Sequence, residues 1–180
     1  MTDLQMIAPD STDARLESAR AFVKAVGELH PGEKAALRRN AGNTIAEARG
    51  ALWFYRLLDE EGHKDREIYF LVATLMGLNK YPLTGNFGLT MAILNGKASQ
   101  ETTMERRFRI LLDATFDGGE MAFRLRQLVK LAASKEVGVD WAQLLVDLRR
   151  WHWADKRVQK RWAQVFYAPA SIDTTGESHG

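Results

Sequence analysis

Apolar residues recur with a helical period along almost the whole chain, and this pattern limits the fold more than any other feature of the sequence. In residues 120 to 134, for example, Met121, Leu125 and Leu128 are three or four positions apart, which places them on one face of a helix. No run of alternating polar and apolar residues bounded by turn residues competes with this pattern. We therefore expect an all-α protein of roughly eight or nine helices in two packed helical bundles.

Prolines, glycines and capping residues set the predicted ends of the helices. Asp140 and Asp155 are expected to cap the last two helices, and the "DGG" at 117–119 is expected to form a tight turn. The predicted helices are residues 11–28, a short helix between Pro31 and Gly42, residues 44–60, 65–78, 90–94, 101–116 and 120–134, and the two helices capped by Asp140 and Asp155.

The segment "NKYPLTGNFG" interrupts the helical pattern with one proline and two glycines. Such a break predicts a loop or a boundary between two packing units. We predict an N-terminal helical bundle over residues 1–80, a loop and short connecting helix over 81–100, and a C-terminal helical bundle over 101–168. Residues 1–10 are expected to form a loose arm, and residues 169–180 a polar flexible tail.

Several classes of protein are disfavoured by what the sequence lacks. There is no cysteine, no apolar run long enough to span a bilayer and no signal peptide at the N-terminus, so we expect a cytoplasmic protein without membrane contact. The four histidines do not have the spacing of metal ligands, and there is no phosphate-binding loop or nucleophile motif. We therefore expect no catalytic residue, no metal, no cofactor and no enzymatic activity.

The net charge is only +2, but the charges are unevenly distributed along the chain. Residues 149–161 contain six basic and one acidic side chain, whereas residues 59–67 contain five acidic and two basic ones. On the last helix the core positions leave one face to four cations, Lys156, Arg157, Lys160 and Arg161. Like charges one helical turn apart repel each other by a few tenths of a kcal/mol per pair, so this face predicts an external anion.

Other basic residues also lack a carboxylate one turn away. They are Arg106, Arg107, Arg126 and Lys130. Arg109 is different, because carboxylates four residues before and after it predict a surface ion pair. Unneutralised cations on three helices are typical of a surface that contacts the phosphates of a nucleic acid without reading its sequence.

Five sequence segments, taken in order, resemble the CasB small subunit of the type I-E CRISPR surveillance complex, Cascade. They are "ALRRNAG", "FYRLL", "ERRFRILLDA", "LRQLVKLAASKEVGVDWAQLLVDLRRW" and "VQKRWAQVFY". The resemblance covers roughly residues 20–167. It implies an all-helical, non-enzymatic subunit that holds nucleic acid during R-loop formation. It adds Arg38, Arg39 and Arg66 to the expected nucleic-acid-binding residues, and Gln127 stands where the family pattern has a second Arg after Arg126.

The partners that the resemblance implies are the large subunit and the repeating backbone subunit of Cascade, a second copy of the chain, the guide RNA, and target DNA including the displaced single strand. Two alternatives remain open. One is a helical scaffold whose basic face docks other subunits and guide RNA and never touches DNA. The other is a free-standing regulator with a helix-turn-helix, for which "DGGEMAFRLRQLVK" is the candidate segment.

Overall fold

A computed structural model describes residues 11–97 and 101–168 of the chain. Within these residues the fold is all-helical and contains no strand, which confirms the predicted fold class. The helices are α1 (Ser11–Gly27), α2 (Pro31–Arg39), the 3-10 helix η1 (Leu52–Leu57), α3 (Glu60–Lys64), α4 (Arg66–Met76), α5 (Phe87–Lys97), α6 (Glu101–Asp113), the 3-10 helix η2 (Asp117–Gly119), α7 (Glu120–Ser134), α8 (Trp141–Arg149) and α9 (Arg157–Phe166). None of these helices has the length and apolar character needed to cross a bilayer.

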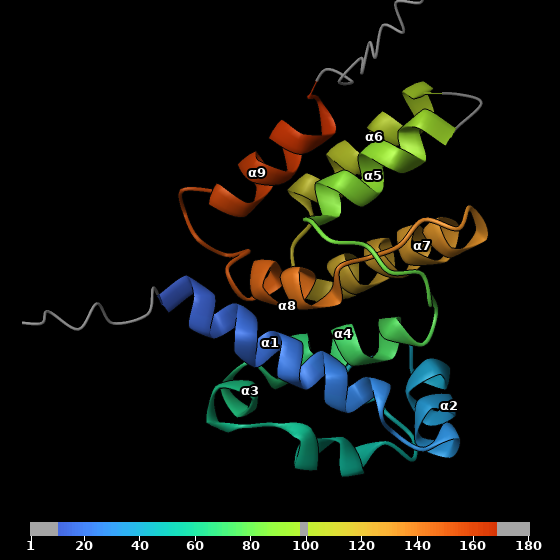
Figure 1. The fold of residues 1–180 in the computed structure, drawn as a ribbon, viewed down its shortest axis with the longest axis vertical. Helices are drawn as coiled ribbons and strands as arrows, with labels where there is room; N and C mark the ends of the chain where they lie inside the picture. Colours follow the sequence, from blue (N-terminus) through green and yellow to red (C-terminus); the bar gives the residue numbers. More distant parts are fainter. Residues whose placement is uncertain (1–10, 98–100, 169–180) are drawn as a thin grey trace, which may run out of the picture.

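The helices form a lower, a middle and an upper group in Figure 1. α1 to α4 lie in the lower part, α7 and α8 cross the middle, and α5, α6 and α9 lie in the upper part. α8 packs against α1 and α4, and α9 packs against α5. The predicted C-terminal bundle therefore contacts the N-terminal one through α8, and the division into two bundles stays a prediction.

Aromatic and aliphatic side chains from all parts of the described chain form the core. Phe54, Phe70 and Phe108 are almost completely buried, and the rings of Phe54 and Phe70 meet edge to face with centroids 5.1 Å apart. The two tryptophans of "WHW" lie in different environments. Trp151 is buried, with its indole N–H donated to a backbone carbonyl 2.8 Å away, whereas Trp153 is half-buried.

The predicted helix over residues 44–60 is wrong. Residues 44–50 form turns, and η1 and α3 follow as two short helices. Asn40 explains the turns, because its side chain donates to the carbonyl of Arg49 (3.1 Å) and accepts from the N–H of the same residue (3.0 Å). Gly50 then takes a positive φ of 65°. Asp59 caps α3 by accepting from the N–H of Gly62 at 2.7 Å.

Other boundaries agree more closely with the sequence. α7 has the predicted bounds, and Asp140 caps α8 by accepting from the N–H of Gln143 at 3.0 Å. α5 is longer than the predicted residues 90–94 because it begins at Phe87, whose ring is buried against that of Trp162 at 5.4 Å. The predicted arm at residues 1–10 and the predicted tail at 169–180 lie outside the described residues.

Candidate nucleic-acid interface

α9 presents its cations to solvent because its other side is fixed in the core. Val158, Trp162 and Phe166 are buried, which leaves Arg157 and Lys160 exposed. This arrangement agrees with the helical face predicted from their spacing.

Lys156 does not belong to that helical face. It precedes α9 and takes a left-handed backbone conformation with a φ of 49°. Asp155 holds this turn, because its carboxylate accepts from the N–H of Arg157 at 3.1 Å. The predicted stacking of Lys156 below Lys160 on one helix is therefore wrong, although both side chains are exposed.

Arg157 has an acidic partner close to it in the sequence. One of its terminal nitrogens lies 2.9 Å from the carboxylate of Asp155. Hydrogen bonding to the Arg157 backbone N–H, together with its guanidinium, lowers the pKa of the Asp155 carboxyl. Both side chains remain substantially exposed, so this pair is a surface ion pair that contributes little to stability.

Arg161 has a buried acidic partner on α8. Its guanidinium lies 3.8 Å from Asp147, which is 2% exposed. Asp147 also accepts from the indole N–H of Trp162 at 2.7 Å and from the amide of Gln143 at 2.9 Å. Burial raises the pKa of the Asp147 carboxyl against the opposite effect of these hydrogen bonds. Of the four predicted cations at α9, Lys156 and Lys160 thus have no ion pair within the described chain.

Two further arginines, Arg15 and Arg150, belong to this region and were not predicted as nucleic-acid-binding residues. The guanidinium of Arg150 lies 5.2 Å from the centre of the Trp153 ring, and that of Arg157 lies 5.5 Å from it. Partial burial, and then the neighbouring charges of Arg15 and Arg161, lower the pKa of Arg150. Arg15 comes from α1, which packs on α8. We call Arg15, Arg150, Lys156, Arg157, Lys160 and Arg161 the α9 basic surface.

Arg149 is also part of the basic stretch, but it is neutralised within the molecule. Its guanidinium lies 2.6 Å from Asp65 and 2.8 Å from Glu61, and only 14% of its side chain is exposed. Two of the five carboxylates in the acidic segment 59–67 therefore hold α8 against the N-terminal helices. Asp59 has a capping role in the same segment.

Arg66 lies at the first position of α4. The only hydrogen bond of its side chain within the described chain is a long one of 3.5 Å to the carbonyl of His63. The flanking carboxylates are engaged elsewhere, since Asp65 binds Arg149 and Glu67 accepts from a backbone N–H at residue 45, 3.0 Å away. Arg66 thus remains an exposed cation.

α6 carries three exposed arginines. Arg106 and Arg107 have no acidic partner in the part of the chain that the structure describes. The predicted ion pair of Arg109 is wrong, because Glu105 instead accepts from the hydroxyl of Tyr167 at 3.0 Å and no carboxylate lies within 4 Å of the Arg109 guanidinium among the described residues. The α6 cations without an ion pair in the described chain are therefore more numerous than predicted.

Arg126 and Lys130 lie on α7, which crosses the molecule below α5 and α9 in Figure 1. The stem of Arg126 packs on the loop after α2, where a Cβ at Gly42 would lie 3.1 Å from its Cδ. Arg38 and Arg39 end α2 just before this loop and are exposed. We call Arg126 and Lys130 the α7 basic surface, and Arg126 in it contacts the N-terminal half of the chain.

Carboxylates and histidines do not gather into a metal site in the described ranges, residues 11–97 and 101–168. No group of three His, Cys, Asp or Glu side chains there is arranged to hold a metal ion.

Comparison with known proteins identifies the family. Residues 33–167 match the family model described as CRISPR-associated protein Cse2. The chain belongs to the CasB/Cse2 family. A Cse2 protein of Thermus thermophilus is 42% identical over 111 residues, which are 61% of this chain and 62% of that relative. The aligned segment thus spans less than two thirds of the relative's length.

Solved structures of the family have the same fold. The crystal structure of CasB from M. ruber is 30% identical, with a TM-score of 0.71 over 83% of this chain and 92% of that one. CasB from Thermus thermophilus is 32% identical, with a TM-score of 0.66 over 89% and 99%. A chain of a CRISPR RNA-guided surveillance complex is 26% identical, with a TM-score of 0.71 over 84% and 92%.

Proposed function

We propose that this chain is the non-catalytic small subunit of a cytoplasmic CRISPR RNA-guided surveillance complex and that it holds DNA strands without sequence preference during R-loop formation. The observation that carries the proposal is the α9 basic surface, where exposed cations are held outward by a buried helix face. Membership of the CasB/Cse2 family and the likeness to a chain of such a complex support the same role. The partners follow from the proposal: other subunits, a second copy, guide RNA, and the target and displaced strands.

The charges suit a contact with phosphates. Lys156 and Lys160 have no ion pair among the described residues, and the neighbouring charges of Arg15 and Arg161 raise the electrostatic cost of the Arg150 charge. A phosphate backbone lowers this cost, and each neutralised phosphate releases condensed counterions. These contacts carry no sequence information, because Lys and Arg contact backbone oxygens and not base edges.

Modest contacts are sufficient for this role. Exchange of a DNA duplex for an RNA–DNA hybrid is nearly balanced in free energy, so a few backbone contacts can shift it. A subunit of net charge +2 binds DNA weakly by itself. Inside an assembly the effective concentration of the subunit at the DNA is high, so contacts that are weak individually are still formed.

The test is the binding of target DNA by assembled complex across a salt series. One complex carries Lys156→Glu and Lys160→Glu on the α9 basic surface, and another carries Arg126→Glu and Lys130→Glu on the α7 basic surface. The matched control carries Arg20→Glu and Lys24→Glu, the same change in charge at two cations of α1 that are already paired with nearby glutamates.

We expect both test variants to weaken capture of the opened DNA. We also expect each lost phosphate contact to reduce the slope of log affinity against log salt by about 1. The control should keep the slope of the parent. If both test variants opened duplex as stably as the parent, with the same salt slope, the proposal would be wrong.

A further inference from the structure

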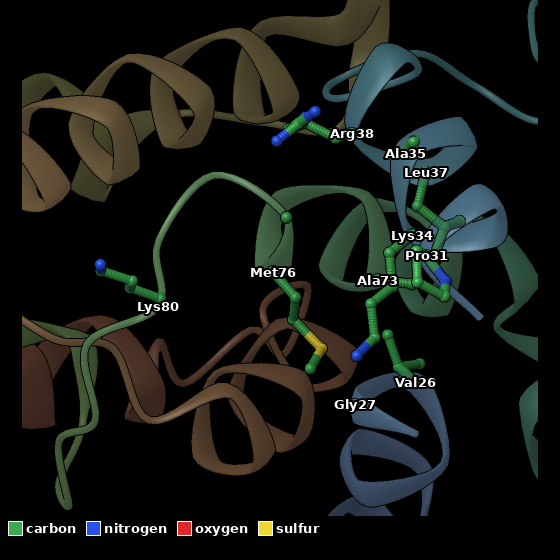
Figure 2. Close-up of a pocket in the computed structure, with 11 residues that line it drawn as sticks. Val26, Gly27, Pro31, Lys34, Ala35, Leu37, Arg38, Ala73, Met76 and Lys80 are labelled. Carbon is green, nitrogen blue, oxygen red and sulfur yellow. The ribbon is translucent and has the colours of Figure 1, made fainter. Parts of the chain in front are cut away.

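A groove with an aliphatic floor lies on the N-terminal half of the molecule, away from α9. It is formed where the end of α1, the whole of α2 and the end of α4 meet, and its volume is about 540 Å³. Figure 2 shows the residues around it. The apolar lining residues are Val26, Pro31, Ala35, Leu37, Ala73 and Met76.

Three cations complete the lining, and no carboxylate does. They are Lys34, Arg38 and Lys80, all exposed. The charged ends of Arg38 and Lys80 lie apart on different sides of the groove in Figure 2, and the ammonium of Lys80 lies 5.7 Å from the centre of the Tyr81 ring. The nearest acidic residue in the sequence, Glu33, is already engaged, because it forms an ion pair with Arg56 and accepts from the N–H of His30 at 3.3 Å. The rim therefore carries positive charge that the described chain does not neutralise.

The position of Arg38 is fixed by close packing. A Cβ at Gly77 would lie 3.0 Å from the Cβ of Arg38, so the end of α4 approaches α2 closely at this point. The groove is thus built mainly where α2 and the end of α4 pack closely, and Lys80 is added from the segment after α4. Such preorganised apolar pockets with a few charged groups are typical of binding sites.

The lining favours a protein segment over a nucleotide. Single-stranded nucleic acids are held by aromatic rings that stack on bases, and none of the described residues that line this groove is aromatic. It also contains no Asn, Gln, Ser or Thr side chain that would bond a base edge. An aliphatic floor accepts a Leu, Ile or Met side chain, and three unneutralised cations are complementary to carboxylates.

We propose that this groove docks a short segment of a partner protein in which a bulky aliphatic side chain is flanked by Asp or Glu. The aliphatic side chain lies on Ala73 and Met76, and the flanking carboxylates bind Lys34, Arg38 and Lys80. Arg38, expected from the sequence to bind nucleic acid, then contacts protein. The inference rests on the proposed membership of a surveillance complex, whose other subunits are the candidate partners.

Site-specific photo-crosslinking in the assembled complex tests the proposal. A benzoyl-phenylalanine at position 34 replaces the lysine at the edge of the groove, and the same group at Lys24 on α1 serves as the control position. We expect position 34 to crosslink to a subunit segment that contains an aliphatic residue between acidic ones, and position 24 not to crosslink there. A crosslink to DNA or RNA, a crosslink to a second copy of this chain, or none from position 34 would each overturn the assignment.

A pair of charge variants gives an independent readout. Lys34→Glu with Lys80→Glu should lower retention of the subunit in the complex about tenfold. Arg38 is left intact, so that a loss is not attributed to a DNA contact. Arg20→Glu with Lys24→Glu is the charge-matched control and should be retained like the parent.

Full retention of the Lys34 and Lys80 variant would refute the docking groove and leave the proposed function standing. Absence of the parent chain itself from the complex would refute the proposed function.

Discussion

The indole N–H of Trp162 donates a hydrogen bond of 2.7 Å to the carboxylate of Asp147, and both side chains are almost completely buried. This bond joins α9 to α8 in the interior of the molecule. It fixes which side of α9 faces inward and therefore which side carries Arg157 and Lys160 outward. Because the carboxylate also lies 3.8 Å from Arg161, the same residue links the core to the basic surface.

The first prediction concerns the donor in this pair. Trp162→Phe keeps an aromatic ring but leaves the buried carboxylate of Asp147 without its shortest hydrogen bond. We expect unfolding to become easier by about 1–3 kcal/mol, measured by chemical denaturation. Trp53→Phe is the matched control, since its indole N–H donates to the carbonyl of Gly50 at an exposed site and its loss should cost clearly less. Equal losses in the two variants would contradict the role of the buried bond.

The second prediction concerns pH. Burial raises the pKa of the Asp147 carboxyl above its ordinary value of 3.8. At pH values that rise above 3.8, the Asp147 carboxyl is therefore protonated more often in the folded state than in the unfolded state. This group thus makes stability fall as the pH rises. Carboxyls with lowered pKa, such as Asp155, have the opposite effect.

Asp147→Asn isolates the contribution of Asp147, because an amide can still accept from Trp162 and does not titrate. We expect the stability of the Asn variant relative to the parent to improve between pH 4 and pH 7, as measured by the denaturation midpoints of both proteins at each pH. A difference that stays constant across this range would contradict the raised pKa.

Local signals in the sequence were sufficient where a helix is bounded by its own residues. Asp140 caps α8 as expected, and the glycines at 118 and 119 separate α6 from α7 with positive φ values. The segment 44–60 was mispredicted because its apolar block "ALWFYRLL" has helical spacing. The competing contacts of Asn40 with Arg49 span nine residues, and they cannot be read from a local period.

The candidate site shows the same limit. The exposed faces of α6, α7 and α9 follow from local periodicity, so their cations were predicted by residue. Arg15 was missed because its proximity to Arg150 depends on the packing of α1 on α8. Arg149 was counted among the basic residues although Asp65, 84 residues away, neutralises it. Pairing across the fold decides which cations stay free, and no spacing rule on one helix gives that information.

The third prediction concerns the contact between α5 and α9. A Cβ at Gly88 would lie 2.2 Å from the carbonyl oxygen of Trp162, so Gly88→Ala must push the two helices apart. We expect a loss of about 1–3 kcal/mol or more, together with weaker DNA capture because α9 moves. Gly96→Ala is the control on the same helix, where nothing lies within 4 Å of the new Cβ. It should leave stability unchanged or raise it by about 0.5–1 kcal/mol.

The fourth prediction separates two adjacent arginines. Arg149→Ala removes the bridge from α8 to Asp65 and Glu61 and should cost about 1–2 kcal/mol of stability, an estimate reduced for the partial exposure of both carboxylates. Arg150→Ala removes a cation–π contact with Trp153 and also relieves the repulsion from Arg15 and Arg161, so it should cost about 0.5–1 kcal/mol or less. For DNA the order is reversed. Loss of Arg150 should weaken capture by the complex and reduce the salt slope by about 1, whereas loss of Arg149 should leave the slope unchanged. Thermal denaturation and DNA binding of the same two variants measure both effects, and a parallel change in the two assays would show that the two arginines do not have separate roles.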